Sequence, residues 1–293
     1  MRSFLKFLVV ATGIILLSAL LAPVLYNFMP FKFEKIFNRL IMIFSLAASV
    51  LFLRPGRHAF EVTGLLPEPG RFKLMGVCFA SGFGALAILV ALRFSFGEAR
   101  WLVQELNAAG WAYKIAAALG AAFLIAAVEE SFFRGFVFLT LKGKWGVNVG
   151  MSLAVTSLFY SLLHFVSLKK PLIGPDPSFW DSLRLTAAPF MSLAQWQSLW
   201  PGALGLFLFG LVLNDLFVKT GSLWAPIGLH AGCVFFVKVD GLLAELLSAR
   251  PLFWGTGKMV DGIINWFFLA GLFVFFRIIL KNSGGNRVIS NHR

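Results

Sequence analysis

The sequence predicts an all-α fold, a polytopic transmembrane helix bundle of about eight spans, from three observations. Of the 293 residues, 59% are hydrophobic and only 13% are charged, whereas soluble domains carry about 25% charged residues. Apolar stretches of about 20 residues, long enough to cross a bilayer, recur along the whole chain. No internal repeat or soluble domain is apparent between them, so residues 1–293 are expected to form a single membrane domain.

The first expected span begins with a basic residue pair, Arg2 and Lys6, as a signal peptide would. Its apolar run is long, however, and ends in LAPVLYNF without a small-residue cleavage site, so we expect a retained helix. The later spans lie between polar or Pro/Gly-rich segments. The seventh span is short and contains Pro226 and His230. The eight spans are expected at about 4–26, 36–54, 73–96, 113–140, 146–166, 201–218, 222–240 and 262–280.

Residues 167–200 form the longest expected loop, in which Trp180 and Trp196 stand among polar residues. Such a composition suits the headgroup region of a membrane. Two interpretations stay open, a plain connecting loop and a gate beside an active site. The tail 283–293 is expected to be flexible.

The formal net charge of +13 is spread over short loops and the tails. This distribution is typical of anchoring against anionic lipid headgroups. No aromatic–basic module for nucleic acid is present, so nucleic acid is not expected as a partner. Cys78 and Cys233 lie in predicted spans and are interpreted as small buried hydrophobes without a disulfide.

Three ionisable residues stand inside the fourth predicted span, in the run EESFFRG. Each costs roughly 2.5–3.5 kcal/mol to insert, and such groups normally mark a functional site. Glu130 and Arg134 have the order and spacing of an i,i+4 ion pair. Glu129 lies about 140° around the helix from Arg134, outside that pair. A carboxylate in apolar surroundings binds protons more strongly, which suits a general base. A purely structural ion-pair network is the alternative.

Two histidines, His164 in TSLFYSLLHF and His230 in TGSLWAPIGLHAG, fall in predicted spans. Either one alone could simply be a hydrogen-bonded buried histidine. With Glu129 they form a candidate catalytic trio, in which a carboxylate and one imidazole activate water and the second imidazole stabilises an oxyanion. The same trio could bind Zn²⁺ as His₂Glu. The residue types leave both schemes open.

These motifs, in this order, resemble the CPBP (Abi) family of intramembrane endopeptidases, whose eukaryotic relatives are the CAAX prenyl proteases of the Ras-converting type. The resemblance covers about residues 115–241, which we expect to be the catalytic core. Its second motif carries Tyr where Phe is usual. The three motifs are Glu129-Glu130 with Arg134, Tyr160-Ser-Leu-Leu-His164, and Ser222-Leu-Trp-Ala-Pro-Ile-Gly-Leu-His230.

The family commonly has Asn or Asp four residues after the last histidine, and this chain has Val234 there. A second oxyanion donor is therefore missing or comes from elsewhere. Asn214, in the run LVLNDLF of the preceding span, is the candidate replacement. Its other interpretation, together with Asp215, is the polar end of a short helix.

The resemblance implies that Glu129 and His164 activate a water and that His230 steadies the oxyanion. Glu130 and Arg134 would hold the helix. No metal or other cofactor is expected in this glutamate-type scheme, with zinc as the alternative. The expected location is the bacterial inner (cytoplasmic) membrane.

The sequence thus predicts an intramembrane endopeptidase that cleaves a peptide bond of a membrane-anchored or lipidated peptide or protein substrate near the surface of the lipid bilayer. The first alternative is a non-catalytic immunity or scaffold protein of the same fold, which Val234 favours. The second is a transporter, since intramembrane Glu and His also build proton relays. The oligomeric state is left open.

Overall fold

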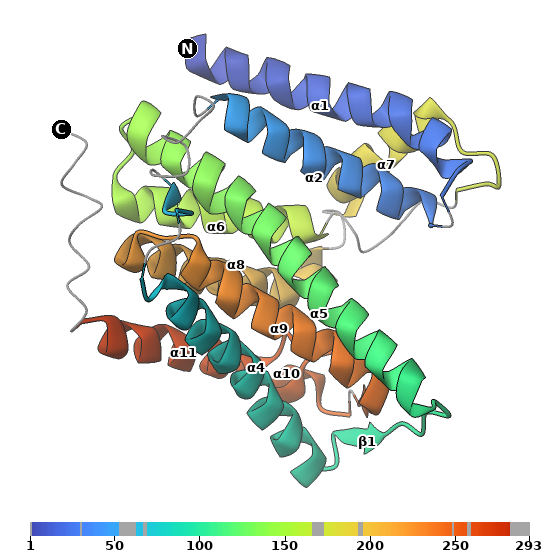
Figure 1. Cartoon of the computed structure of the whole chain (residues 1–293), viewed down its shortest axis with the longest axis vertical. Helices are drawn as coiled ribbons and strands as arrows, with labels where there is room; N and C mark the ends of the chain where they lie inside the picture. Colours follow the sequence, from blue (N-terminus) through green and yellow to red (C-terminus); the bar gives the residue numbers. More distant parts are fainter. Residues whose placement is uncertain are drawn as a thin grey trace. The chain divides into compact units, whose positions relative to one another are not determined.

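The computed structural model describes residues 2–29, 31–52, 63–66, 69–165, 173–192, 196–247, 249–256 and 259–281. These residues are mostly helical (Figure 1). They divide into two compact units, each built from two stretches of the chain. The first unit comprises Met1–Ala59 and Leu162–Leu199, and the second comprises Phe60–Ser161 and Trp200–Arg293.

The first unit contains three helices, α1 (Arg2–Tyr26), α2 (Phe33–Phe52) and α7 (Phe179–Ser192). They pack on one another through an apolar cluster that includes Phe37 and Leu185. Helix α7 is capped at its start, because the Asp181 carboxylate accepts hydrogen bonds from the backbone and hydroxyl of Ser178. These hydrogen bonds hold the pKa of Asp181 below its usual value.

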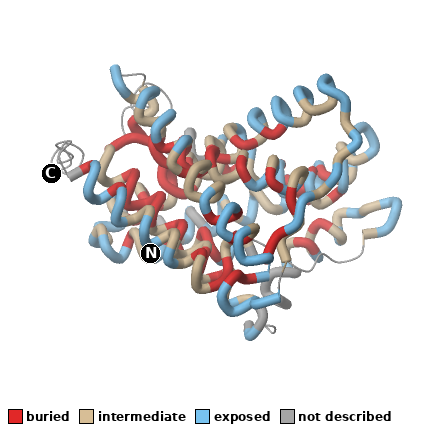
Figure 2. The backbone as a smooth tube through the Cα atoms, turned by 90° about the horizontal axis from the view of Figure 1, so that it is seen from below, coloured by how far each residue is buried: buried red, intermediate tan, exposed pale blue. Residues whose placement is uncertain are grey.

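The second unit is a helix bundle with a small two-stranded antiparallel sheet. Helix α9 (Trp224–Leu243) packs against α4 (Arg71–Ser95) and α5 (Ala108–Glu130). Figure 2 shows how buried and exposed residues are distributed along the backbone. The remaining elements are β1 (Ala99–Trp101), α6 (Val149–Phe165), α8 (Trp196–Thr220), β2 (Ala244–Leu246), α10 (Pro251–Trp254) and α11 (Ile263–Lys281), with the last turn of α6 and the first residues of α8 belonging to the first unit.

Six helices among the described residues are long and apolar enough to cross a membrane. The prediction of a polytopic all-α bundle is confirmed, although the sequence suggested about eight spans. The other two predicted spans are also helices, but α6 is shorter and α2 carries Glu34, Lys35 and Arg39 near its start. The six are Leu8–Tyr26, Arg71–Ser95, Ala108–Gly143, Leu199–Thr220, Trp224–Leu243 and Ile263–Leu280.

The segment expected as one loop over residues 167–200 contains helix α7 and the start of α8 in its described part. The prediction of a loop is therefore wrong for residues 179–192, which form a helix whose Leu183 and Leu185 pack in the apolar cluster with α1 and α2. The tail 283–293 lies outside the described residues. Cys78 and Cys233 are free thiols, and Cys78 is fully buried.

Candidate active site

The site begins where α5 changes its helical geometry. Glu129 and Glu130 are the last residues of α5, and the chain continues as two π-helical stretches, η1 (Ser131–Phe138) and η2 (Thr140–Lys144). A π-helix forms i→i+5 hydrogen bonds, is rare, and is frequently found at functional sites. The predicted positions of Glu129 and Arg134 assumed a regular step of about 100° per residue. That regular geometry ends at Glu130.

The predicted ion pair between Glu130 and Arg134 is present, and both side chains are completely buried. Arg134 Nη1 lies 3.2 Å from each carboxylate oxygen of Glu130. Arg134 Nη2 donates to the Gly210 carbonyl at 3.1 Å, and Nε donates to Asn214 Oδ1 at 3.1 Å. The Tyr160 ring lies 5.0 Å from the guanidinium carbon, a cation–π distance. Every nitrogen of this buried cation thus has a polar partner.

Asn214 is fully buried on α8, and its Oδ1 accepts the hydrogen bond from Arg134 Nε. Its amide nitrogen donates to the Ser157 hydroxyl at 2.8 Å and to the Leu153 carbonyl at 3.3 Å. An amide NH₂ has two hydrogens, so both are engaged. The predicted role as an oxyanion donor would require the amide to leave Ser157 and Leu153.

His230 lies on α9 between the two carboxylates and is only 3% exposed. Its Nδ1 is 2.8 Å from Glu130 Oε1, and its Nε2 is 3.8 Å from Glu129 Oε2. The ring packs edge-to-face against Tyr160 and Phe209. From the sequence, only the ion pair of Glu130 with Arg134 was predicted. In the structure Glu130 contacts both Arg134 and His230, so it links the buried guanidinium to the candidate catalytic imidazole.

Two glycines that flank His230 set the position of α9, a signal that the sequence reading missed. A Cβ on Gly228 would lie closer than 3.0 Å to the Met75 carbonyl of α4, and one on Gly232 would meet the Phe79 carbonyl equally closely. Gly228 and Gly232 form a GxxxG motif, which lets membrane helices approach at backbone distance. The close contact of α9 with α4 therefore depends on these glycines.

His164 and Val234 complete the positions predicted from the sequence. His164 is partly buried on the last turn of α6, one turn after Tyr160, and belongs to the first unit. Its role in activating water stays a prediction. Val234 lies one turn after His230 and packs into an apolar cluster with Ile227 and Ala231, so its side chain offers no hydrogen-bond donor.

A metal-ligand cluster was the alternative use of these residues. Within the described part of the chain, no group of three or more His, Cys, Asp or Glu side chains is arranged to hold a metal ion. The expectation that the protein binds no zinc stays a prediction.

The helices and the buried cluster define an integral, multi-pass membrane protein with an ionisable site among its helices. Residues 110–236 match the model of the type II CAAX prenyl endopeptidase Rce1-like family. The match confirms, over this part of the chain, the resemblance to the CPBP family that the motifs indicated. The matched region contains all of the predicted site residues. No significant match was found among curated proteins or among solved structures.

Proposed function

We propose that the protein is an intramembrane endopeptidase that hydrolyses a peptide bond of a membrane-associated substrate. The carrying observation is that Glu129 Oε2 faces His230 Nε2 at 3.8 Å inside a bundle of membrane helices. That separation exceeds a direct hydrogen bond. The family match over residues 110–236 supports peptide hydrolysis as the reaction.

In the proposed mechanism, Glu129 takes a proton from a water, whose oxygen attacks the substrate carbonyl carbon. The resemblance to the CPBP family implies that His164 shares this role. The carbonyl oxygen becomes an oxyanion, which a hydrogen bond from His230 stabilises. When the carbon–nitrogen bond breaks, the proton passes to the leaving amine. The products are one peptide with a new carboxyl end and one with a new amino end.

The contacts of His230 support its role as the donor. The carboxylate of Glu130 is paired with Arg134 and therefore acts as a hydrogen-bond acceptor. Because His230 Nδ1 lies 2.8 Å from this carboxylate, we assign the shared proton to Nδ1. For Nε2 to donate as well, the ring must be doubly protonated. With Glu129 and Glu130 ionised, the charges of the imidazolium and Arg134 make the four-residue cluster neutral. Charged side chains in a membrane are normally paired with opposite charges, which reduces the cost of burying them.

The proposed substrates are membrane-anchored or lipidated polypeptides, because the site lies among membrane-spanning helices. A prenylated C-terminus, a bacteriocin-type precursor and the C-terminal anchor of an exported protein each fit this description. The proposed location is the bacterial inner membrane.

Glu129→Gln at the native locus tests the proposal, because the amide keeps the shape and loses the base. We expect substrate turnover to fall by at least about 10²-fold, while membrane insertion and thermal melting stay unchanged. Proteomic comparison of membrane and secreted fractions with wild type should show a precursor that accumulates and a shortened product that disappears. Glu105→Gln, which changes an exposed acid outside the site, is the matched control.

The alternative is a non-catalytic immunity or scaffold protein with the same fold, and Val234 is the observation that favours it. In that case the Glu129→Gln strain would show no processing difference although wild type is expressed and the mutant protein is folded. That outcome would replace the protease proposal.

A further inference from the structure

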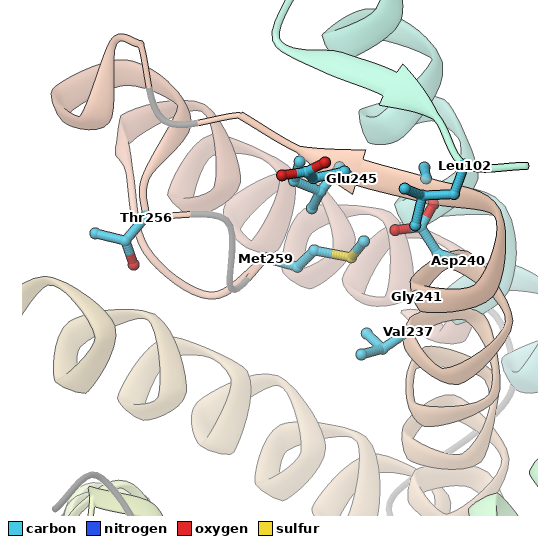
Figure 3. A pocket seen from close by; sticks show the side chains of 9 residues that line it. Leu102, Val237, Asp240, Gly241, Glu245, Thr256 and Met259 are labelled. Carbon is cyan, nitrogen blue, oxygen red and sulfur yellow. The ribbon is translucent and has the colours of Figure 1, made fainter.

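A second polar site lies in the second unit at the C-terminal end of α9, ten residues beyond His230. Because an α-helix rises about 1.5 Å per residue, Asp240 lies about 15 Å from His230 along the helix. The site is a cavity of about 380 Å³. Leu102, Val237, Leu246 and Met259 supply apolar walls, and Asp240 and Glu245 supply two carboxylates (Figure 3).

Asp240 is held in an unfavourable position. Its side chain is 7% exposed, and no hydrogen bond or ion pair joins its carboxylate to any described residue. Burying a charged group without a hydrogen bond is costly. The group also lies in the last turn of α9, where the helix dipole disfavours negative charge. The charge of Arg93 acts on Asp240, but no contact joins them. A bound cation would relieve all of these costs.

Glu245 differs because it already has a partner. Arg100 contacts Glu245 through Nε at 2.7 Å and Nη2 at 2.6 Å, and both side chains are substantially exposed. A guanidinium has five N–H donors, so Arg100 keeps donors for an anionic group beside the cavity. The cavity therefore offers an acceptor for a cation at Asp240. Arg100 does not line the cavity, but it is paired with the lining residue Glu245 and has donors for an anion there.

The surroundings place this cavity at a membrane surface. Asp240 lies near the end of the membrane-spanning stretch Trp224–Leu243. Large apolar side chains near the cavity are strongly exposed, with Trp101 at 70% and Val103 at 92% on the β1 side. Leu252 and Phe253 of α10 are also exposed. Exposed aromatic and aliphatic groups at a span end are typical of the boundary between acyl chains and headgroups.

We propose that this cavity binds the zwitterionic headgroup of an aminophospholipid, with the primary ammonium on Asp240 and the phosphate beside Arg100. A primary ammonium carries three N–H donors and can hydrogen-bond to a buried carboxylate. The quaternary ammonium of a choline headgroup has no N–H donor. The site is independent of peptide hydrolysis, and its test does not require a substrate.

The experiment compares phosphatidylethanolamine with phosphatidylcholine of the same acyl chains, bound to the full-length purified protein and counted by native mass spectrometry. Both lipids are zwitterionic, so the net charge of the protein does not favour either. We expect wild type to retain phosphatidylethanolamine about ten-fold better, as one charge-assisted hydrogen bond implies. Asp240→Asn should abolish that preference, and Glu105→Gln should keep it.

A second variant tests the cavity by shape. Gly241 lines it, and an added Cβ there meets no atom within 4 Å. Gly241→Leu should therefore fold and fill the cavity, which removes the preference. Gly84→Leu, at a helical glycine of α4 with equally open surroundings, should keep it. Equal retention of both lipids by wild type, or a preference that survives Asp240→Asn and Gly241→Leu, would overturn the proposal.

Discussion

At the scale of single residues, burial of Arg134 is made possible by a complete set of partners. Its three nitrogens contact Glu130, Asn214 and the Gly210 carbonyl, and the Tyr160 ring covers the guanidinium. Removing one member of a buried ion pair leaves the other charge uncompensated. The guanidinium therefore stabilises the fold and also holds the carboxylate that contacts His230.

We predict that Arg134→Ala lowers the free energy of unfolding by about 3–5 kcal/mol and reduces turnover, because the buried Glu130 loses its guanidinium partner and keeps only the contact with His230. Thermal and denaturant unfolding in detergent measure the change. Arg184→Ala is the control, since the exposed Arg184 forms an i,i+3 pair with Asp181 and its loss should cost less than about 1 kcal/mol. Equal losses of unfolding free energy in the two variants would disprove the stabilising role of Arg134.

At the scale of elements, the contact between α9 and α4 decides where the imidazole stands. Gly228 and Gly232 meet carbonyls of α4, and Gly82 of α4 meets the Leu229 carbonyl in return. His230 lies between the two α9 glycines, on a helix whose position therefore follows from backbone contact. Any side chain at these glycines would push α9 and its histidine away from the end of α5.

Gly232→Ala is expected to lower the free energy of unfolding by about 1–3 kcal/mol, as overpacking does. It should also reduce turnover because His230 moves relative to Glu129 and Glu130. Gly84→Ala on α4, which meets no atom within 4 Å, should be neutral or stabilising by up to about 1 kcal/mol. Unfolding curves and cleavage rates of both variants provide the comparison. An unaffected Gly232→Ala protein would show that the two helices can separate freely.

At the scale of the whole molecule, the protein is a membrane bundle whose acidic groups in the candidate site are already in contact with cations or imidazole. Glu130 contacts Arg134 and His230 Nδ1, and a guanidinium beside a carboxylate disfavours a metal cation there. In the alternative metal scheme only His230 Nε2 could bind the metal, and it would first have to lose its proton.

The purified protein is therefore expected to contain well below one equivalent of zinc after dialysis, and chelators should leave cleavage unchanged. Metal analysis by inductively coupled plasma mass spectrometry, with an assay in the presence of a chelator, makes the measurement. About one equivalent of zinc that resists dialysis and is lost in His230→Ala would establish the metal scheme instead.

Local spacing was enough to predict part of the site. The ion pair of Glu130 with Arg134 follows from a separation of four residues along one chain segment. The contact of His230 with Glu130 joins residues 100 positions apart, and no spacing rule connects them. The π-helical geometry after Glu130 and the use of both Asn214 hydrogens were also not readable from the residue pattern. The GxxxG motif was readable and was missed.

The sequence by itself determined the membrane class, the helical architecture and the residues that carry charge into the bundle, because apolar length and i,i+4 spacing act locally. The tertiary structure alone decided that Glu130 contacts both Arg134 and His230, that Asn214 accepts a hydrogen bond from Arg134, and that Asp240 lines a cavity at the C-terminal end of α9. The physical reason is that these contacts depend on how separate helices pack. That packing follows from backbone approach at particular glycines and from the requirement that each buried polar group find a partner.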